Sequence, residues 1–513
     1  MCRQRVVIIG SGLGGLSCGA ILAKNGYEVT VLEQGLQVGG CLQCFSRRGA
    51  RFETGMHFIG SAAEGQTLDR LLQYLEVKKD IVLSPLDADG YEVVALNGRR
   101  YRFAQGREAF IRQMSDYFPQ QHDNLVRYFD LVEQVAGASA LHSLRHAESD
   151  SAVNTEYQLR SVNEVIDSII TDAELAKVLV GSLPLYAAER DKTPFATHAF
   201  IMDFYNQSAF RIVGGSDKVA QSLTETIGRY GGQVLNKCRV TRIVCDATHA
   251  TGVEVNGEQF VAADYVISDA HPMRTLELLD TKLIRPAFRQ RINAMPQTVG
   301  AFSVYLEFKD NTVPYQNYNF YGYNTDTPWD CEQYDEMSWP KGFLYMHFCA
   351  PSLLEERLHR HTLKERIVTP HYAQTGVIIS YMHIGEVQQW SGTKVGQRGA
   401  DYEHFKQRKA DALLDAVECH FPSLRANIKH YYTSTPLTYQ DYTGTEGGSM
   451  YGVARDIHLG AACRVPHRTK VPNVFQTGQN INSHGILGVL VGTIVTCSEF
   501  LTAERIYQQM VNA

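Results

Sequence analysis

The first 33 residues constrain the fold of this chain more than any other part. Val6–Ile9 is an apolar run typical of a buried strand, and a glycine-rich turn follows it at once. Gly10, Gly12 and Gly15 have the spacing G-x-G-x-x-G. The first glycine suits a tight turn, the second allows backbone to approach a pyrophosphate, and the third permits close helix–strand packing. This pattern predicts a strand, a turn and a helix whose N-terminus binds phosphate.

A second strand, Val29–Leu32, ends at Glu33, about 20 residues beyond the glycines. The carboxylate of Glu33 is expected to accept hydrogen bonds from ribose hydroxyls, and it would repel the 2′-phosphate of NADP. Together these features predict a dinucleotide-binding unit. Its predicted cofactor-contacting residues are Gly10, Ser11, Gly12, Leu13, Gly14, Gly15, Glu33 and Gln34.

Length and composition narrow the class of protein. A chain of 513 residues is expected to form two packed domains. A net charge of −6, with 44% hydrophobic and 20% charged residues, disfavours nucleic-acid binding. Eleven scattered cysteines indicate reduced thiols and a cytoplasmic location. The apolar run 485–495 is too short and too glycine-rich for a membrane span, and we expect no signal peptide because cleavage would destroy the first unit.

Nucleotide-binding character appears in three separate stretches, which predicts an interleaved α/β architecture. The expected nucleotide domain comprises residues 1–75, 206–275 and 451–513. The expected substrate domain is mixed α+β and comprises residues 76–205, mostly helical, and 276–450. Within the latter, strands are expected at Val299–Phe308 and Gly376–His383.

Two further glycine-rich segments resemble those of the FAD family that includes glutathione reductase-like and amine oxidase-like enzymes. Gly39 and Gly40 resemble the pair that runs beside the diphosphate, and Val471–Gln479 resembles the strand that ends the flavin site. A helix starting at Gly485 would then aim its N-terminus at the flavin. The resemblance implies FAD as the cofactor, and a Rossmann-like domain of the glutathione reductase type. The further contacts it implies are Gly39, Gly40, Cys41, Val240, Gly478, Gln479, Gly485, Ile486 and Leu487.

The segment Glu53–Gly60 resembles the acid-Thr-Gly-x-His-aromatic-x-Gly phrase of retinol saturases and, less closely, of carotenoid isomerases and phytoene desaturases. Glu53 stands where the family more often has Asp. The resemblance implies a flavoenzyme acting on C=C bonds of a long hydrophobic isoprenoid. Saturation is favoured, with desaturation and isomerisation left open. The alternatives are an amine oxidase-like flavoenzyme and a non-catalytic prenyl-lipid carrier of the same fold.

Histidine can supply a proton near neutral pH, and saturation needs a proton donor, so His57 is the candidate catalytic residue. Glu53 is expected to help orient the nearby backbone, and Tyr186 and Arg190 are weaker candidates for facing the substrate. An aromatic cluster is a candidate wall for an apolar substrate tunnel, although core packing explains it equally well. Its members are Tyr315, Tyr318, Phe320, Tyr321 and Tyr323.

Other features lead to weaker expectations. Cys41 and Cys44 form a C-x-x-C pair, but no second NAD-binding glycine motif supports disulfide chemistry, and no metal site is expected. The alternating basic and apolar residues of Lys282–Ile292 can rest on a membrane surface, which suggests peripheral contact. The electron donor or acceptor is left open.

Overall fold

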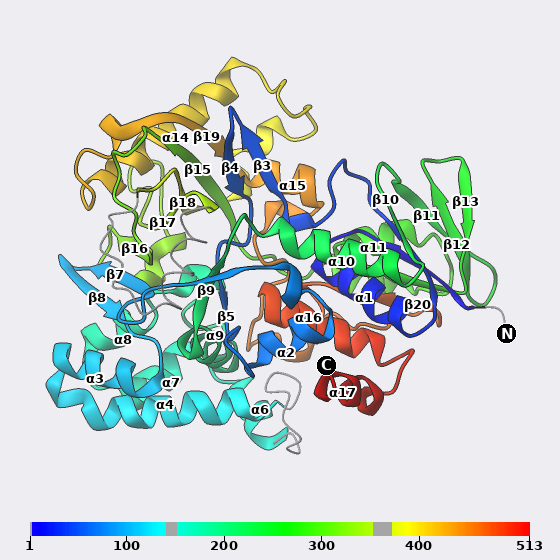
Figure 1. The fold of residues 1–513 in the computed structure, drawn as a ribbon, viewed down its shortest axis with the longest axis horizontal. Helices are drawn as coiled ribbons and strands as arrows, with labels where there is room; N and C mark the ends of the chain where they lie inside the picture. The colour runs from blue at the N-terminus through cyan, green and yellow to red at the C-terminus, as the bar shows by residue number, and fades with distance from the viewer. Residues whose placement is uncertain (1–2, 140–150, 352–371) are drawn as a thin grey trace.

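The computed structural model describes residues 3–139, 151–351 and 372–513. Figure 1 shows two regions joined along the middle of the molecule. The region on the right carries β10–β13 and β20, the region at the upper left carries a large sheet, and α16 lies between them.

A five-stranded parallel sheet forms the centre of the first region, in the order β10-β2-β1-β14-β20. Its strands come from stretches far apart in the sequence, as predicted for an interleaved Rossmann-like domain. They are β1 (Arg5–Ile9), β2 (Glu28–Leu32), β10 (Gln233–Leu235), β14 (Tyr265–Ser268) and β20 (Val474–Gln476). The apolar residues of β1 are buried, which is expected for a parallel strand covered on both faces.

Helices share an apolar core with one face of this sheet. They are α1 (Leu13–Lys24), α2 (Thr67–Tyr74), α10 (Asp217–Arg229), α16 (Gly485–Cys497) and α17 (Ala503–Val511). A second core lies against the other face, and it includes Leu276, Ile284, Ile292 and Met295 from beyond the predicted boundary at residue 275. Its elements are the antiparallel strands β11 (Val240–Cys245), β12 (Ala250–Val255) and β13 (Gln259–Ala262), with α11 (Pro272–Leu278) and α12 (Pro286–Asn293).

A seven-stranded sheet forms the second region, in the order β19-β15-β18-β17-β16-β7-β8. All its neighbours pair antiparallel except β16 and β7. The strands are β7 (Glu92–Leu96), β8 (Arg99–Phe103), β15 (Gly300–Phe308), β16 (Asn319–Tyr323), β17 (Gly342–Phe348), β18 (Thr375–Met382) and β19 (Ile428–Ser434). The strands predicted within 299–308 and 376–383 are confirmed as β15 and β18.

Helices flank this sheet. Side chains of α3, α4 and α7–α9 pack into one core with the sheet, and those of α14 into another. The helices are α3 (Arg107–Tyr117), α4 (His122–Gly137), α6 (Ser151–Tyr157), α7 (Val162–Ile169), α8 (Ala173–Leu179), α9 (Phe195–Gln207), α14 (Ala400–Glu418) and α15 (Pro436–Thr443). Small sheets connect the regions, built from β3 (Cys44–Arg47) with β4 (Ala50–Glu53), and from β5 (Ile59–Gly60), β9 (Ala209–Ile212) and β6 (Leu83–Pro85).

The expectation that residues 76–205 are mostly helical misses the hairpin β7–β8. Its turn is Asn97-Gly98, with φ of 50° and 75°. Positive φ at both central residues is typical of the type I′ turn that favours a tight hairpin. The Asn-Gly pair was therefore a readable signal for these two strands.

A buried carboxyl lies where β7 pairs with β16. Glu92 is 2% exposed, and its Oε1 accepts a hydrogen bond from Tyr321 Oη at 3.0 Å. Removal from water raises the pKa of Glu92 to about 8 despite that hydrogen bond. The folded protein therefore keeps Glu92 protonated to about pH 8, whereas the unfolded chain releases the proton near pH 4.5.

This difference predicts that Glu92 makes stability fall as the pH rises from about 4.5 to 8, with a slope of up to about 1.4 kcal/mol per pH unit. The variant Glu92→Gln keeps an acceptor for Tyr321 but cannot ionise. Its melting temperature relative to the wild type should therefore increase between pH 5 and pH 8. An unchanged difference between the two proteins across this range would show that Glu92 does not carry the effect.

Candidate functional site

A cavity of about 740 Å³ runs between the two regions of the fold. At one end its wall includes the β1–α1 turn, Glu33 at the end of β2 and Val240 at the start of β11. At the other end it reaches β17 and β18 of the seven-stranded sheet. The cavity therefore connects the nucleotide-binding unit with the substrate region.

The N-termini of α1 and α16 both face this cavity. The N-cap residue of α1 is Gly12 and that of α16 is His484, and neither helix has a side-chain hydrogen bond at its cap. Free N–H groups and the positive end of the helix dipole favour a negatively charged ligand. Because two helix N-termini face the same cavity, the cavity suits a ligand that carries a diphosphate and a second group able to hold negative charge.

The turn before α1 has no room for side chains. A Cβ at Gly15 would lie 2.2 Å from the carbonyl oxygen of Gly10, and one at Gly14 would lie 2.8 Å from the amide nitrogen of Gly478. Gly10 has a φ of 93° and Gly39 a φ of 113°, which favour glycine. The turn is therefore built for close approach of backbone to backbone and of backbone to a ligand. These features fit FAD.

Most residues predicted to contact the cofactor lie in the cavity wall. They are Gly10, Ser11, Gly12, Leu13, Gly14, Glu33, Gln34, Gly39, Gly40, Cys41, Val240, Gly478, Gln479, Gly485 and Ile486. Two predicted residues do not line it: Gly15 packs against Gly10, and Leu487 packs in the core behind α16. Both residues lie in helices, and successive side chains of a helix point to different faces, so neighbours of wall residues need not line the wall.

Glu33 is held in place by hydrogen bonds from the chain. Its Oε2 accepts from the amide and hydroxyl of Ser11 at 3.0 and 2.6 Å, and its Oε1 accepts from the Gly35 amide at 2.7 Å. The carboxylate is thereby fixed at the cavity wall, where a ribose would need an acceptor.

His57 lies in the cavity wall beside Glu53. The His57 Nδ1 atom is 3.5 Å from Glu53 Oε2, and both side chains are buried. Neither atom has a hydrogen-bond partner in the described parts of the chain. The imidazole therefore has only the Glu53 carboxyl as a polar neighbour at this nitrogen in the described structure.

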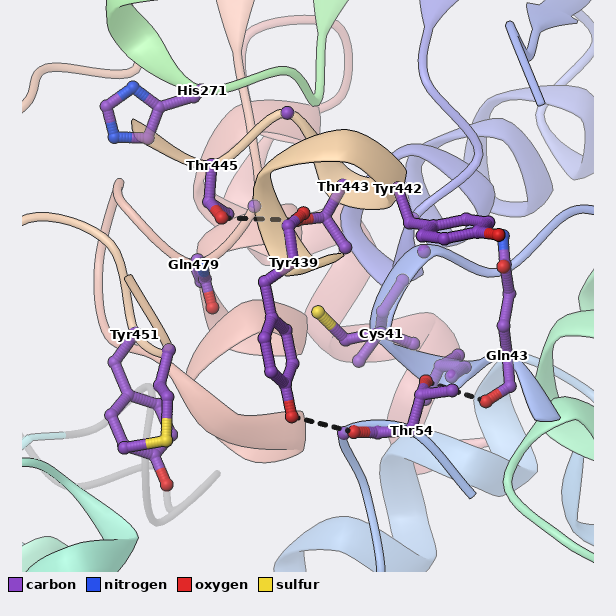
Figure 2. Close-up of a pocket in the computed structure, with 18 of the residues that line it drawn as sticks. Cys41, Gln43, Thr54, His271, Tyr439, Tyr442, Thr443, Thr445, Tyr451 and Gln479 are labelled. Carbon is purple, nitrogen blue, oxygen red and sulfur yellow. Dashed lines mark hydrogen bonds between the residues drawn. The ribbon is translucent and has the colours of Figure 1, made fainter. Parts of the chain in front are cut away.

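The end of the cavity next to the seven-stranded sheet is aromatic and apolar. In the described part of the chain, the wall formed by β17, β18 and residues 184–185 and 450–451 contains no charged side chain. Tyr439 donates its hydroxyl proton to the Thr54 carbonyl (3.3 Å), and Tyr451 donates to the Pro184 carbonyl (2.9 Å). Figure 2 shows Tyr439 between Cys41 and Tyr451. With these hydroxyls bound to backbone, the wall suits a ligand with few polar groups.

The aromatic cluster predicted to line a tunnel lies elsewhere, and that prediction is wrong. Residues 320–323 belong to β16, where Phe320 packs on one face of the sheet and Tyr321 on the other. Because β16 lies in the middle of the sheet with both faces covered, its rings fill the cores. Tyr315 does not line the cavity either, and its hydroxyl donates to Asn317 Oδ1.

The two weaker candidates for substrate contact are also outside the wall. Tyr186 is 3% exposed and its hydroxyl lies 2.7 Å from His198 Nδ1, so it belongs to the helical core. Arg190 is exposed on the surface.

Several residues of the site were missed from the sequence. Asp269 follows β14 and lines the cavity beside the glycine turn. His484 lies behind the wall, with its ring 4.5 Å from that of Tyr451, and burial lowers the pKa of His484 to about 4, so the imidazole is neutral. Neither residue was predicted as part of the site, because the side chains around each of them come from distant segments of the chain.

The cysteine pair has the properties of buried thiols. Burial raises the pKa of Cys41 and of Cys44 to about 11. The thiolate is the nucleophile in thiol–disulfide exchange, so protonated thiols are poorly suited to dithiol chemistry.

The basic segment proposed for membrane contact is partly used inside the fold. Arg289 donates to the carbonyls of Leu276 and Leu279, and Arg291 donates to those of Ala462 and Arg464. Lys282 and Arg285 stay exposed, and a peripheral contact through them stays a prediction. Within the ranges that the structure describes, no helix is long and apolar enough to cross a bilayer.

Comparisons with known proteins identify the family to which the chain is related. Residues 13–340 match the family described as flavin containing amine oxidoreductase. The human all-trans-retinol 13,14-reductase is 29% identical over 99% of this chain and 87% of its own length. Prolycopene isomerase 1 of an Oncidium hybrid cultivar is 21% identical over 97% of this chain and 84% of its own.

Among solved structures, an oxidoreductase from Methanosarcina mazei aligns with a TM-score of 0.65 at 15% identity, over 96% of this chain and all of that one. This likeness confirms the fold, and the relatives confirm the resemblance to retinol saturases and carotenoid isomerases. The matched family covers more than half of the chain. The chain therefore belongs to the flavin-containing amine oxidoreductase family and is an FAD-dependent oxidoreductase.

Proposed function

We propose that this protein saturates a C=C bond in a long conjugated isoprenoid of the retinoid or carotenoid kind. The observation that carries the proposal is the uncharged aromatic end of the cavity, which continues directly from the flavin-binding segments. The names of the relatives, all-trans-retinol 13,14-reductase and prolycopene isomerase, support the same substrate class. Desaturation and isomerisation use the same site and differ in the product.

The cavity can bind such a substrate without many hydrogen bonds. Each 100 Å² of apolar surface buried contributes about 2.5 kcal/mol. When bound, FAD supplies the exchange of hydride or electron pairs with a carbon held against its ring. Leu344, Ile379 and Tyr381 of the sheet would orient the polyene and exclude water. His57 would hold the proton that saturation adds, and Glu53 would orient the imidazole and stabilise its charged form.

The described residues favour the proposal over two alternatives. Amine oxidases often place a lysine near the flavin, and no lysine lines the described cavity wall. A lipid carrier that had lost its flavin would not need the crowded glycine turn or the two uncapped helix ends facing one cavity.

The proposal predicts the product of a single turnover. Anaerobically reduced holoenzyme should be reoxidised by all-trans-retinol or a carotenoid, and the product should gain two hydrogens by mass. An unchanged mass with a shifted retention time would identify an isomerase instead. Reduction of the oxidised flavin by an amine, with no reaction of the reduced flavin with any polyene, would contradict the proposal.

The proton-donor role predicts a specific defect in the variant His57→Gln. Loss of general acid catalysis should slow reoxidation of the reduced flavin by the polyene about 10²-fold or more, while the FAD content stays unchanged. Glu53→Gln should give a smaller defect, because it removes only the orienting carboxylate. The surface variant His122→Gln is the matched control and should behave as the wild type. Full-speed reoxidation in His57→Gln would exclude His57 as the donor.

The apolar end of the cavity can be filled without touching the flavin segments. Ile379 on β18 is half-buried and lines this end. Ile379→Trp should lower kcat/KM for the polyene at least about tenfold, equivalent to about 1.4 kcal/mol, with normal FAD content. Ile379→Val should stay close to the wild type. An equally active tryptophan variant would place the substrate elsewhere.

A further inference from the structure

Asp269 brings a carboxyl group against the glycine segments of the flavin site. It follows β14 and lies between the N-terminal and C-terminal glycine segments. A Cβ placed on Gly12 would be 2.4 Å from Asp269 Oδ2, and one on Gly14 or Gly478 would be 2.6 or 2.5 Å from Oδ1. The carboxyl lies close enough to the backbone N–H groups of Gly12 and Gly15 for them to favour its charged form. It therefore occupies part of the N–H array with which α1 would bind the diphosphate.

The ionisable side chains that face Asp269 do not neutralise a negative charge. From β2 it faces Glu33, and from the segment after Gly40 it faces the Cys41 thiol. The glycine turn and the Gly478 turn bring no ionisable side chain. Within the described ranges no cation forms an ion pair with Asp269: Arg274, which follows on the chain, pairs with Glu277 and Glu446.

His271, two residues beyond Asp269, is directed away from it. Its Nε2 lies 3.0 Å from Gln297 Oε1, and burial lowers its pKa, so it adds no positive charge. The Asp269 carboxyl is therefore a half-buried acid whose ionisable neighbours are an acid and a thiol.

We propose that Asp269 is a cofactor-positioning residue that carries a proton whenever the flavin diphosphate is bound, so that FAD binding takes up one proton from solvent. An ionised Asp269 would place a third negative charge beside the two of the diphosphate, at the same N–H groups. The neutral acid keeps its contacts with both glycine segments and can donate a hydrogen bond.

The direction of the pH effect follows from the free protein. Burial, with a smaller contribution from Glu33, raises the pKa of Asp269 to about 7 before any diphosphate is present. The diphosphate raises it further. Below about pH 7 the acid is already neutral and FAD binds with full affinity. Above about pH 7, Asp269 must take up a proton when FAD binds, so the Kd for FAD rises with pH and approaches a tenfold increase per pH unit.

The test is the affinity for FAD as a function of pH. Holoenzyme is diluted in series at constant ionic strength between pH 6 and pH 8.5, and released FAD is measured by its fluorescence. The diphosphate stays ionised and the oxidised flavin ring stays neutral over this range. We expect the Kd of the wild type to be about tenfold higher at pH 8 than at pH 6.

The variant Asp269→Asn mimics the neutral acid and should bind FAD with a Kd that does not change with pH. Asp264→Asn is the matched control, because Asp264 lies at the other end of β14 and pairs with Arg5 on the surface. It should keep the pH dependence of the wild type. A wild-type Kd that does not change with pH would overturn the proposal, and so would an Asp269→Asn variant with the slope of the wild type.

Should Asp269→Asn fail to fold, the wild type alone decides. Calorimetry of FAD binding to apoprotein at pH 8, in two buffers of different ionisation enthalpy, counts the protons taken up. Nearly one proton per FAD is expected, and none would overturn the proposal. Neither measurement involves a polyene, so this inference and the proposed substrate succeed or fail separately.

Discussion

The N-termini of α1 and α16 meet at one cavity, and neither N-cap residue caps its helix with its own side chain. A helix end leaves backbone N–H groups without partners inside the helix, and burying them without partners costs free energy. The two helices come from opposite ends of the chain and share one apolar core. A ligand bound at both helix ends would therefore stabilise the contact between the first and last parts of the chain. Cofactor binding is thus expected to stabilise the packing of α1 against α16.

The rest of the molecule is arranged around that meeting point. The parallel sheet places Glu33 and Asp269 at the carboxyl ends of β2 and β14, which is where open α/β sheets bind ligands. The seven-stranded sheet covers the opposite end of the cavity with uncharged side chains. His57 lies in the wall beside a buried carboxylate. One continuous cavity thus combines a polar nucleotide end, the buried pair of His57 and Glu53, and an apolar end.

The sequence could predict the features whose signals lie within one short segment, and it could not predict contacts between segments far apart along the chain. The β1–α1–β2 unit was predictable because its signals are local: an apolar run, fixed glycine spacing, and Asn25 at the end of α1. The start of α16 at Gly485 was predicted from the resemblance to the FAD family, and the structure confirms it. The Asn97-Gly98 hairpin was equally local and was overlooked.

Long-range contacts were beyond such reasoning. The aromatic residues of β16 resemble a tunnel wall in sequence, and only the packing of both sheet faces shows that they fill cores. Tyr439, Tyr451 and Asp269 reach the site through the pairing of distant strands and the docking of α15, which no local pattern encodes. Residues that contact a ligand from separate segments become visible only when the fold brings them together.

The central claim is that the N-terminal glycine turn and the start of α16 together hold FAD. The visible absorption spectrum of the purified protein, with identification of the cofactor released on denaturation, tests it most directly. The account predicts a yellow protein that releases one FAD per chain. A colourless protein that takes up no FAD on reconstitution would contradict it.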